Sequence, residues 1–150
     1  MAFLCDTNIF IRIARQNDPM RAIALEAIKI LRARKEDLCF TSQILAEFWN
    51  VCTRPITARG GLGQPLDIVD RKVKLIERHF RFLPENNQSH DEWRRLLVTH
   101  KIIGVQVYDA RLVAIMNAHQ VANLLTFNTS DFRRYSQITA ISPSDVKPEG

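Results

Sequence analysis

The sequence predicts a single three-layer α/β/α domain with a mostly parallel central sheet of four to five short strands. Short apolar segments alternate with longer segments in which apolar residues recur every three or four positions, the pattern of strands alternating with helices. A chain of 150 residues is long enough to bury one core. Its 46% hydrophobic and 25% charged residues are typical of a globular protein rather than a disordered one.

The first half of the chain is expected to alternate strands and helices. Residues 2–6, AFLCD, form a short buried strand, and helix follows at once over 7–15. A second helix is expected to begin at Asp18-Pro19, because aspartate is a good N-cap and proline suits the first helical position. The following strand, helix, Gly- and Pro-punctuated loop and helix are expected over 38–42, 43–52, 53–65 and 66–80.

The second half continues the alternation. Ser89 and Glu92 fit an S-x-x-E capping box that opens a helix, and another helix over 107–116 follows Gly104. The remaining strand segments and one helical turn are expected over 81–84, 121–127, 138–142 and 130–135. Residues 1–142 therefore form a single domain, and 143–150 form a flexible C-terminal tail.

The bulk chemistry narrows the class of protein. A net charge of +5 favours a polyanionic partner such as nucleic acid, although only weakly. The start MAFLCDTNIF does not resemble a secretory signal, and no apolar run reaches the roughly 18 residues of a membrane span, so no membrane association is expected. Three cysteines without CxxC spacing indicate buried free thiols in a reducing cytoplasm, in preference to a disulfide or a zinc site.

Two carboxylates stand in apolar stripes of predicted helices. Asp109 lies one turn before the apolar pair Leu112 and Val113, and aspartate is seldom buried unless something pairs with it. Its alternative explanation is a contact with the N-terminal dipole of its helix. Glu47 has the apolar neighbours Ile44 and Val51 at helical spacing, so it pairs with a buried arginine or serves a site.

The other candidates follow predicted strands. Asp6 ends the first strand and could simply cap the helix that follows. Asp131 follows a later strand and could cap the turn FRRY, while Thr126 and Asn128 could be turn-formers. Because parallel strands end at one edge of a sheet, however, all of these residues would share one rim.

A cluster of carboxylates at one rim needs a cation. Two carboxylates about 5 Å apart repel by roughly 3 kcal/mol at an effective dielectric near 20, so the cluster must bind protons or metal. Oxygen ligands without His or Cys select hard ions, and Mg²⁺ or Mn²⁺ fits best. Such an ion commonly serves hydrolysis of a phosphodiester, which gives the basic balance of the chain a purpose.

Four segments, LCDTNIFI, QILAEFWNV, VYDARLVAIM and LLTFNTSDF, resemble in order and spacing the signature segments of PIN-domain ribonucleases, especially the VapC-type toxins of bacterial toxin–antitoxin pairs. The likeness spans residues 2 to 141. It implies a PIN-like parallel sheet flanked by helices, Mg²⁺- or Mn²⁺-dependent endoribonuclease activity on an RNA substrate, homodimers and an inhibitory antitoxin protein.

Carried over by position, the resemblance implies metal-binding and catalytic roles for four acids. These are Asp6, Glu47, Asp109 and Asp131. Thr7 and Asn8 match the small polar residues that orient the first carboxylate, and Thr126 and Asn128 lie beside the fourth acidic region. Asn128 stands where many relatives carry an acid, which puts a second metal site in doubt.

The loop between the third and fourth predicted helices offers two cations. Arg54 and Arg59 could contact RNA phosphate there, although the loop could equally be a plain flexible connection. Its GGLG sequence is not a P-loop, because no Gly-Lys-Ser/Thr follows.

Three other classes of protein compete with a nuclease. A dehalogenase-type phosphatase needs a second aspartate two residues after the first, where this chain has Asn8. A phosphoacceptor receiver domain needs a lysine at the end of a late strand, which TFNTSDF does not offer. A non-catalytic PIN domain, acting as an RNA-binding or protein-interaction module, remains the alternative function.

Overall fold

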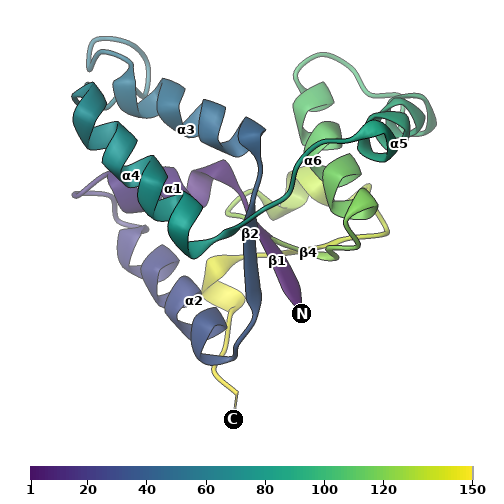
Figure 1. Ribbon diagram of the computed structural model, residues 1–150, viewed down its shortest axis with the longest axis horizontal. Coiled ribbons are helices and arrows are strands. Elements are labelled where there is room, and N and C mark those ends of the chain that lie inside the picture. The colour runs from purple at the N-terminus through teal and green to yellow at the C-terminus, as the bar shows by residue number, and fades with distance from the viewer. Residues whose placement is uncertain (150) are drawn as a thin grey trace.

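The computed structural model describes residues 1–149 and consists of five strands, six α-helices and two short 3₁₀ helices in those residues (Figure 1). The strands are β1 Ala2–Cys5, β2 Asp37–Phe40, β3 Arg81–Phe82, β4 Asn123–Leu125 and β5 Thr139–Ile141. The α-helices are α1 Thr7–Ala14, α2 Arg21–Ala33, α3 Ser42–Thr53, α4 Leu66–His79, α5 Asn87–Thr99 and α6 Gln106–Ala118. The 3₁₀ helices are η1 Thr129–Phe132 and η2 Pro143–Asp145.

All strands pair in parallel in a single sheet of order β3-β2-β1-β4-β5, which confirms the predicted sheet. The chain builds outward from β1 through β2 to β3 and then returns to place β4 on the other side of β1. Strand order therefore reverses between β1 and β4. In open parallel sheets this reversal opens a crevice at the carboxyl ends of the two strands, where ligands bind.

The reversal also sorts the helices into two layers. Right-handed crossovers place the helices of an outward run on one face of a sheet and those of the return on the other. Figure 1 shows α1 to α4 on one side of the strands and α5 with α6 on the other. The three-layer α/β/α prediction is therefore confirmed.

The core is continuous from the sheet into both helical layers. Leu4, Cys5, Leu124 and Leu125 have no exposed surface, as expected for central strands covered on both faces. The consecutive residues 112–116 of α6 are all buried, so this helix is enclosed nearly all round. Cys5, Cys39 and Cys52 are free and buried, as predicted. Among residues 1–149, every helix is too short or too polar to serve as a membrane-spanning segment.

Two helix starts differ from the prediction. α2 begins at Arg21 rather than at Asp18-Pro19, because Asp18 Oδ1 accepts a hydrogen bond from the backbone N–H of Met20 (2.8 Å) in a turn before the helix. The helix α5 begins at Asn87, with Asn86 and Ser89 forming a reciprocal capping box. Ser89 is therefore the third helical residue and not the cap.

The predicted tail boundary at residue 142 falls inside folded structure. η2 packs against α2, and Val146 is buried. The physical reason is that Pro143 and Val146 are apolar and are buried where this segment packs against α2, so residues 143–146 belong to the domain. The last residue of the predicted tail, Gly150, lies outside the described residues.

The loop 54–65 is folded back onto the end of α3. The backbone N–H of Leu62 donates to Val51 O (3.0 Å), Gly63 N–H to Arg54 O (2.7 Å) and Gln64 N–H to Cys52 O (2.8 Å). These bonds satisfy carbonyls that the helix end would otherwise leave free. The loop is therefore an ordered turn held by backbone hydrogen bonds, and not a plain flexible connection.

Gly61→Ala will destabilise the protein by about 2–4 kcal/mol, the range of severe steric substitutions. A β-carbon at Gly61 would lie 2.2 Å from Pro55 O and 2.6 Å from Arg54 O, so the loop backbone would have to move. The matched control is Gly104→Ala, because Gly104 has φ +61 with open space around its Cα. That change will cost only the roughly 1 kcal/mol of a left-handed alanine. Urea unfolding of both variants measures the difference, and equal costs would contradict it.

Candidate active site

The site begins with Asp6 and Thr126, which follow the neighbouring strands β1 and β4 at the point of strand reversal. Thr126 Oγ1 donates a hydrogen bond to Asp6 Oδ2 at 2.8 Å. The backbone N–H of Thr7 donates to Asp6 Oδ1, also at 2.8 Å. Both side chains are buried. The capping role of Asp6 and its place at the strand end are therefore combined in one residue.

Asn8 joins this pair from the first turn of α1. Its Nδ2 donates to Asp6 Oδ2 (3.3 Å) and to Thr126 Oγ1 (3.2 Å), and its Oδ1 accepts from the backbone N–H of Phe127 (3.2 Å). The backbone N–H of Asn128 donates to Thr126 Oγ1 (3.0 Å). The Thr126 hydroxyl thus uses its one donor and both acceptor lone pairs, which fixes the Asp6 carboxyl in one orientation.

Glu47 reaches the site from α3 but lies at its exposed rim, and not in the buried stripe that its neighbours suggested. The helix turns Ile44 and Phe48 into the core and leaves Glu47 beside them at the surface. Gln43 Nε2 donates to Glu47 Oε1 (3.0 Å) and to the backbone carbonyl of Tyr108 in α6 (3.1 Å). Gln43 therefore bridges the two helices that flank the acids.

The acids lie close enough to perturb each other's charge. Burial raises the pKa of Asp109 to about 6, and the charges of Asp6, Asp131 and Glu47 add to the rise. The pKa of Asp6 is also raised, and burial is the largest cause. The hydrogen bonds from Thr126 and Thr7 oppose this rise. The pKa of Glu47 is raised by partial desolvation and by the charge of Asp6, an effect that solvent screens because the side chain is exposed.

This negative charge is poorly compensated. Within residues 1–149 no ion pair involves Asp6, Glu47, Asp109 or Asp131. The cation that opposes the rise in the pKa of Asp109 is Arg134, which follows η1. A site of this charge and burial favours a bound cation.

A model of the PIN domain matches residues 3–138, which is most of the chain. The chain belongs to the PIN domain family. A comparison with curated proteins found no match.

Solved structures share the fold of this PIN domain. VapBC2 of Rickettsia felis, solved bound to a DNA fragment from its promoter, has a TM-score of 0.69 at 16% identity over 95% of this chain and 98% of that chain. VapBC-1 of nontypeable Haemophilus influenzae has a TM-score of 0.69 at 22% identity, over 96% and 99%. VapC20 of Mycobacterium tuberculosis, described as a Sarcin-Ricin loop cleaving toxin, has 0.65 at 16%, over 89% and 95%.

The side chains of this PIN domain are not arranged as a ready metal cage. Among residues 1–149, no three His, Cys, Asp or Glu side chains surround one point closely enough to hold an ion. Asp6 accepts hydrogen bonds from Thr7, Asn8 and Thr126, and Glu47 accepts one from Gln43. Each carboxylate is therefore stabilised by its own donors. In residues 1–149 the four acids therefore do not surround a single point.

The oxygen donors nevertheless fit a hard divalent ion. Mg²⁺ needs only one or two carboxylates and keeps several waters. Two buried oxygens beside the acids, Thr7 Oγ1 and Gln43 Oε1, have no hydrogen-bond partner among residues 1–149. Thr7 Oγ1 lies near enough to Glu47 to oppose the rise in the pKa of that carboxyl. Asp6 Oδ1 accepts a single hydrogen bond and keeps a lone pair for a ligand.

Some predicted residues stand apart from this centre, and others were not anticipated. Arg54 caps the end of α3, about two turns past Glu47, and Arg59 lies further along the loop. Asn128 is exposed, and its backbone rather than its side chain joins the network. Gln43 was missed although it stands four residues before Glu47, the spacing of a helical side-chain pair. Arg134 belongs to no motif or helical spacing that could have identified it from the sequence.

Thr126→Val will destabilise this PIN domain by about 2–3 kcal/mol, because the isosteric change leaves the buried Asp6 carboxylate without its 2.8 Å donor. The control is Thr53→Val, whose hydroxyl bonds only the carbonyl of Trp49 in its own helix (2.7 Å). That variant will change the free energy of unfolding by less than about 0.5 kcal/mol. Chemical denaturation compares them, and similar losses in both would contradict the assigned role of Thr126.

Proposed function

We propose that this PIN domain is a Mg²⁺- or Mn²⁺-dependent endoribonuclease and the toxin of a toxin–antitoxin pair. The observation that carries the proposal is the group of acids at the reversal between β1 and β4: burial raises the pKa of Asp109 to about 6, and the charges of Asp6, Asp131 and Glu47 add to the rise. Carboxylates held together in this way are suited to a divalent ion and a phosphodiester substrate.

The acids are assigned to the cation and the polar residues to Asp6. Asp6, Glu47, Asp109 and Asp131 are the candidates to hold the ion. When bound, it polarises a phosphoryl oxygen and activates a water for in-line attack. Thr126, Asn8 and the Thr7 amide hold the Asp6 carboxyl in one orientation before substrate arrives, so little reorganisation is needed at the moment of reaction.

The remaining residues act on substrate position and on protons. Gln43 ties α3 to α6 and thereby fixes the helices that carry Glu47 and Asp109 relative to each other. Arg134 places a positive charge near Asp109, where the phosphate of an RNA strand would also lie. Asp109, with a pKa of about 6 in the absence of metal, would lose its proton when the cation binds, so cation binding is expected to strengthen as pH rises through about 6.

The assignment as a toxin with an antitoxin partner and a homodimeric state rests on likeness. VapBC2 of Rickettsia felis and VapBC-1 of Haemophilus influenzae share the fold over nearly the whole of both chains. VapC20 of Mycobacterium tuberculosis, with the same fold, is a Sarcin-Ricin loop cleaving toxin. The alternative is a non-catalytic PIN domain that binds RNA or protein. The exposed residue Asn128 favours this alternative, because it offers an amide where many relatives carry an acid.

The test is cleavage by the purified chain. Labelled single-stranded and hairpin RNA are incubated with Mg²⁺ or Mn²⁺, with chelator, and with the Asp6→Asn variant. Metal-dependent internal cuts that both chelator and the variant abolish will support the nuclease. RNA that is bound but never cut will overturn it in favour of the binding module. Sequencing of cut ends after induction in cells then identifies the RNA.

A further inference from the structure

The end of α1 and the end of α3 bring two guanidinium groups to one place. Arg15 caps the end of α1, and Arg54 caps the end of α3. A β-carbon built at Gly60 would lie 3.6 Å from Arg15 Nη2 and 3.9 Å from Arg54 Nη2. We call Arg15 and Arg54 the arginine pair. Both groups therefore stand within reach of a single anion beside Gly60.

The conformation of the loop at Gly60 brings the two arginines together. Arg15 Nη2 donates to the carbonyl of Gly60 at 3.0 Å, which ties α1 to the loop. Gly60 takes φ +74, a backbone conformation that favours glycine, and a side chain there would enter the space between the guanidiniums. Gly61 N–H donates to Ala58 O at 3.0 Å, which closes the turn. The glycines thus leave an open position between two cations.

The positive charge of the pair is only partly neutralised by protein groups, because Arg15 shares one carboxylate with another arginine and Arg54 has none in the described part of the chain. Arg54 is in no ion pair among residues 1–149, and its buried Nε has no hydrogen-bond partner there. Arg15 lies 3.9 Å from Asp18, but that carboxylate already faces Arg12 at 3.3 Å through both oxygens. Lys72 lines the hollow of about 550 Å³ on the Arg15 side. Two guanidiniums held together with one shared carboxylate nearby keep an excess of positive charge and are suited to a phosphate, which they bind through charged forks.

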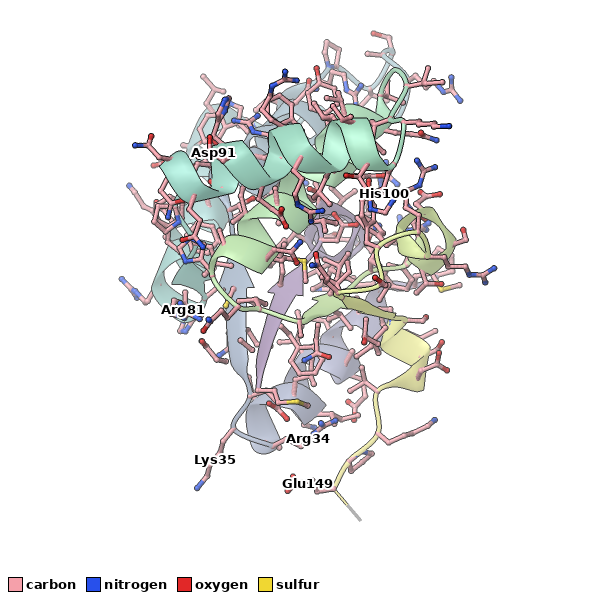
Figure 2. The ribbon with its side chains drawn as sticks, turned by 90° about the vertical axis from the view of Figure 1, so that its right-hand side faces the viewer. Arg34, Lys35, Arg81, Asp91, His100 and Glu149 are labelled. Atoms are coloured by element: carbon pink, nitrogen blue, oxygen red, sulfur yellow. The ribbon has the colours of Figure 1, made fainter. Side chains whose placement is uncertain are left out.

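The position of the pair relative to the acids identifies its ligand. Figure 1 shows α1 and α3 leaving the carboxyl ends of the strands in the same direction. At roughly 1.5 Å per residue, Arg15 lies about 14 Å along α1 from Asp6, and Arg54 lies about 10 Å along α3 from Glu47. That span corresponds to about two to four nucleotides of a single strand. Other cations, such as Arg34 and Lys35, lie at the opposite end of the molecule from α5 (Figure 2) and precede the start of β2, whereas Asp6 follows the end of β1.

We infer that the arginine pair binds a backbone phosphate of the RNA substrate two to four nucleotides from the cleaved bond. This inference rests on the proposed nuclease function. It predicts a subsite that holds the strand without reading its sequence, because phosphate contacts position a nucleic acid and base contacts specify it.

The test measures binding of fluorescein-labelled RNA by anisotropy in the cleavage-defective Asp109→Asn chain. Arg15→Gln and Arg54→Gln will each weaken binding of a twelve-nucleotide RNA by about tenfold, whereas their effect will vanish for a two-nucleotide RNA. If the pair shares one phosphate, the slope of log affinity against log salt will fall by about 0.7 in each variant and no further in the double variant. Arg15→Lys and Arg54→Lys keep the charge without the fork and will lose less affinity.

The control is Arg71→Gln, which removes one charge from an exposed ion pair with Asp67 on α4. Loss of RNA affinity equal to that of the control, or a slope that falls by about 1.4 in the double variant, will overturn the shared subsite. Variants that lose affinity for polyglutamate but not for RNA will overturn it in favour of an acidic protein ligand. Wild-type cleavage is measured separately, so a chain that cuts RNA but shows no effect of the pair refutes this inference alone. A chain that never cuts refutes the nuclease.

Discussion

Asp109→Asn will abolish RNA cleavage, with a loss on the order of a thousandfold or more, while the fold is retained. The substitution keeps the shape of the side chain but removes the charge that the proposed cation needs, and metal-assisted hydrolysis depends on that ion. Asp109 is the residue whose charge is coupled to all three other acids, so it stands at the electrostatic centre of the group. Single-turnover cleavage with Mn²⁺ in excess measures the loss.

The matched control for this prediction is Asp91→Asn. Asp91 is an exposed aspartate on α5, on the outer side of that helix layer (Figure 2). It carries the same chemical change without touching the acids, so its cleavage rate and circular-dichroism spectrum will match those of the wild type. Wild-type activity in Asp109→Asn would remove Asp109 from the mechanism. A collapsed spectrum in that variant would instead assign it to the fold.

The second expected result is that a divalent ion stabilises the protein at pH values at which Asp109 is ionised and the acids repel one another. The pKa of Asp109 in the folded protein, about 6, lies above its ordinary value of 3.8, so the folded state binds the proton more tightly than the unfolded state does. Stability from this group is complete below about pH 4 and is lost as pH rises through about 6. After discounting for solvent screening of a half-buried group, the loss is about 1–2 kcal/mol.

Mg²⁺ or Mn²⁺ at a hundred times its dissociation constant will add about 2.7 kcal/mol at pH 7, which raises the melting temperature by about 5–10 °C. The pKa values of Glu36 and Glu92 are lowered by their cationic partners and give the opposite pH trend, so the comparison is the difference between wild type and Asp109→Asn. Differential scanning fluorimetry across pH, with chelator or metal at matched ionic strength, measures it. A metal effect of equal size in Asp109→Asn would place the ion elsewhere.

The sheet and the gathering of acids were predictable because local sequence determines them. Asp6 directly follows an apolar run, and Asp109 sits one turn before Leu112 in a buried helix, so a parallel sheet had to bring both near one edge. The orientation of Asp6 was not predictable. It depends on a hydrogen bond to Thr126 across 120 residues, which no local pattern encodes.

The errors have similar physical origins. Ser89 and Glu92 have the spacing of a capping box, but Asn86 stands three residues earlier and is also a good cap, so the helix starts one turn sooner. Glu47 has apolar neighbours at helical spacing, yet side chains at the edge of a buried stripe can still face solvent. For the loop 54–65, the frequent glycine and proline left open a plain flexible connection as one of two alternatives. Its glycines instead permit a tight return onto α3.

The pairing of β1 with β4 determines when the hydrogen-bond network around Asp6 can form during synthesis of the chain. β1 and Asp6 emerge from the ribosome 120 residues before Thr126. Until β4 arrives, β1 has an open edge and the Asp6 carboxyl lacks its buried donor. A nascent or truncated chain that stops before β4 therefore cannot form the β1–β4 pairing or the buried hydrogen bond between Asp6 and Thr126.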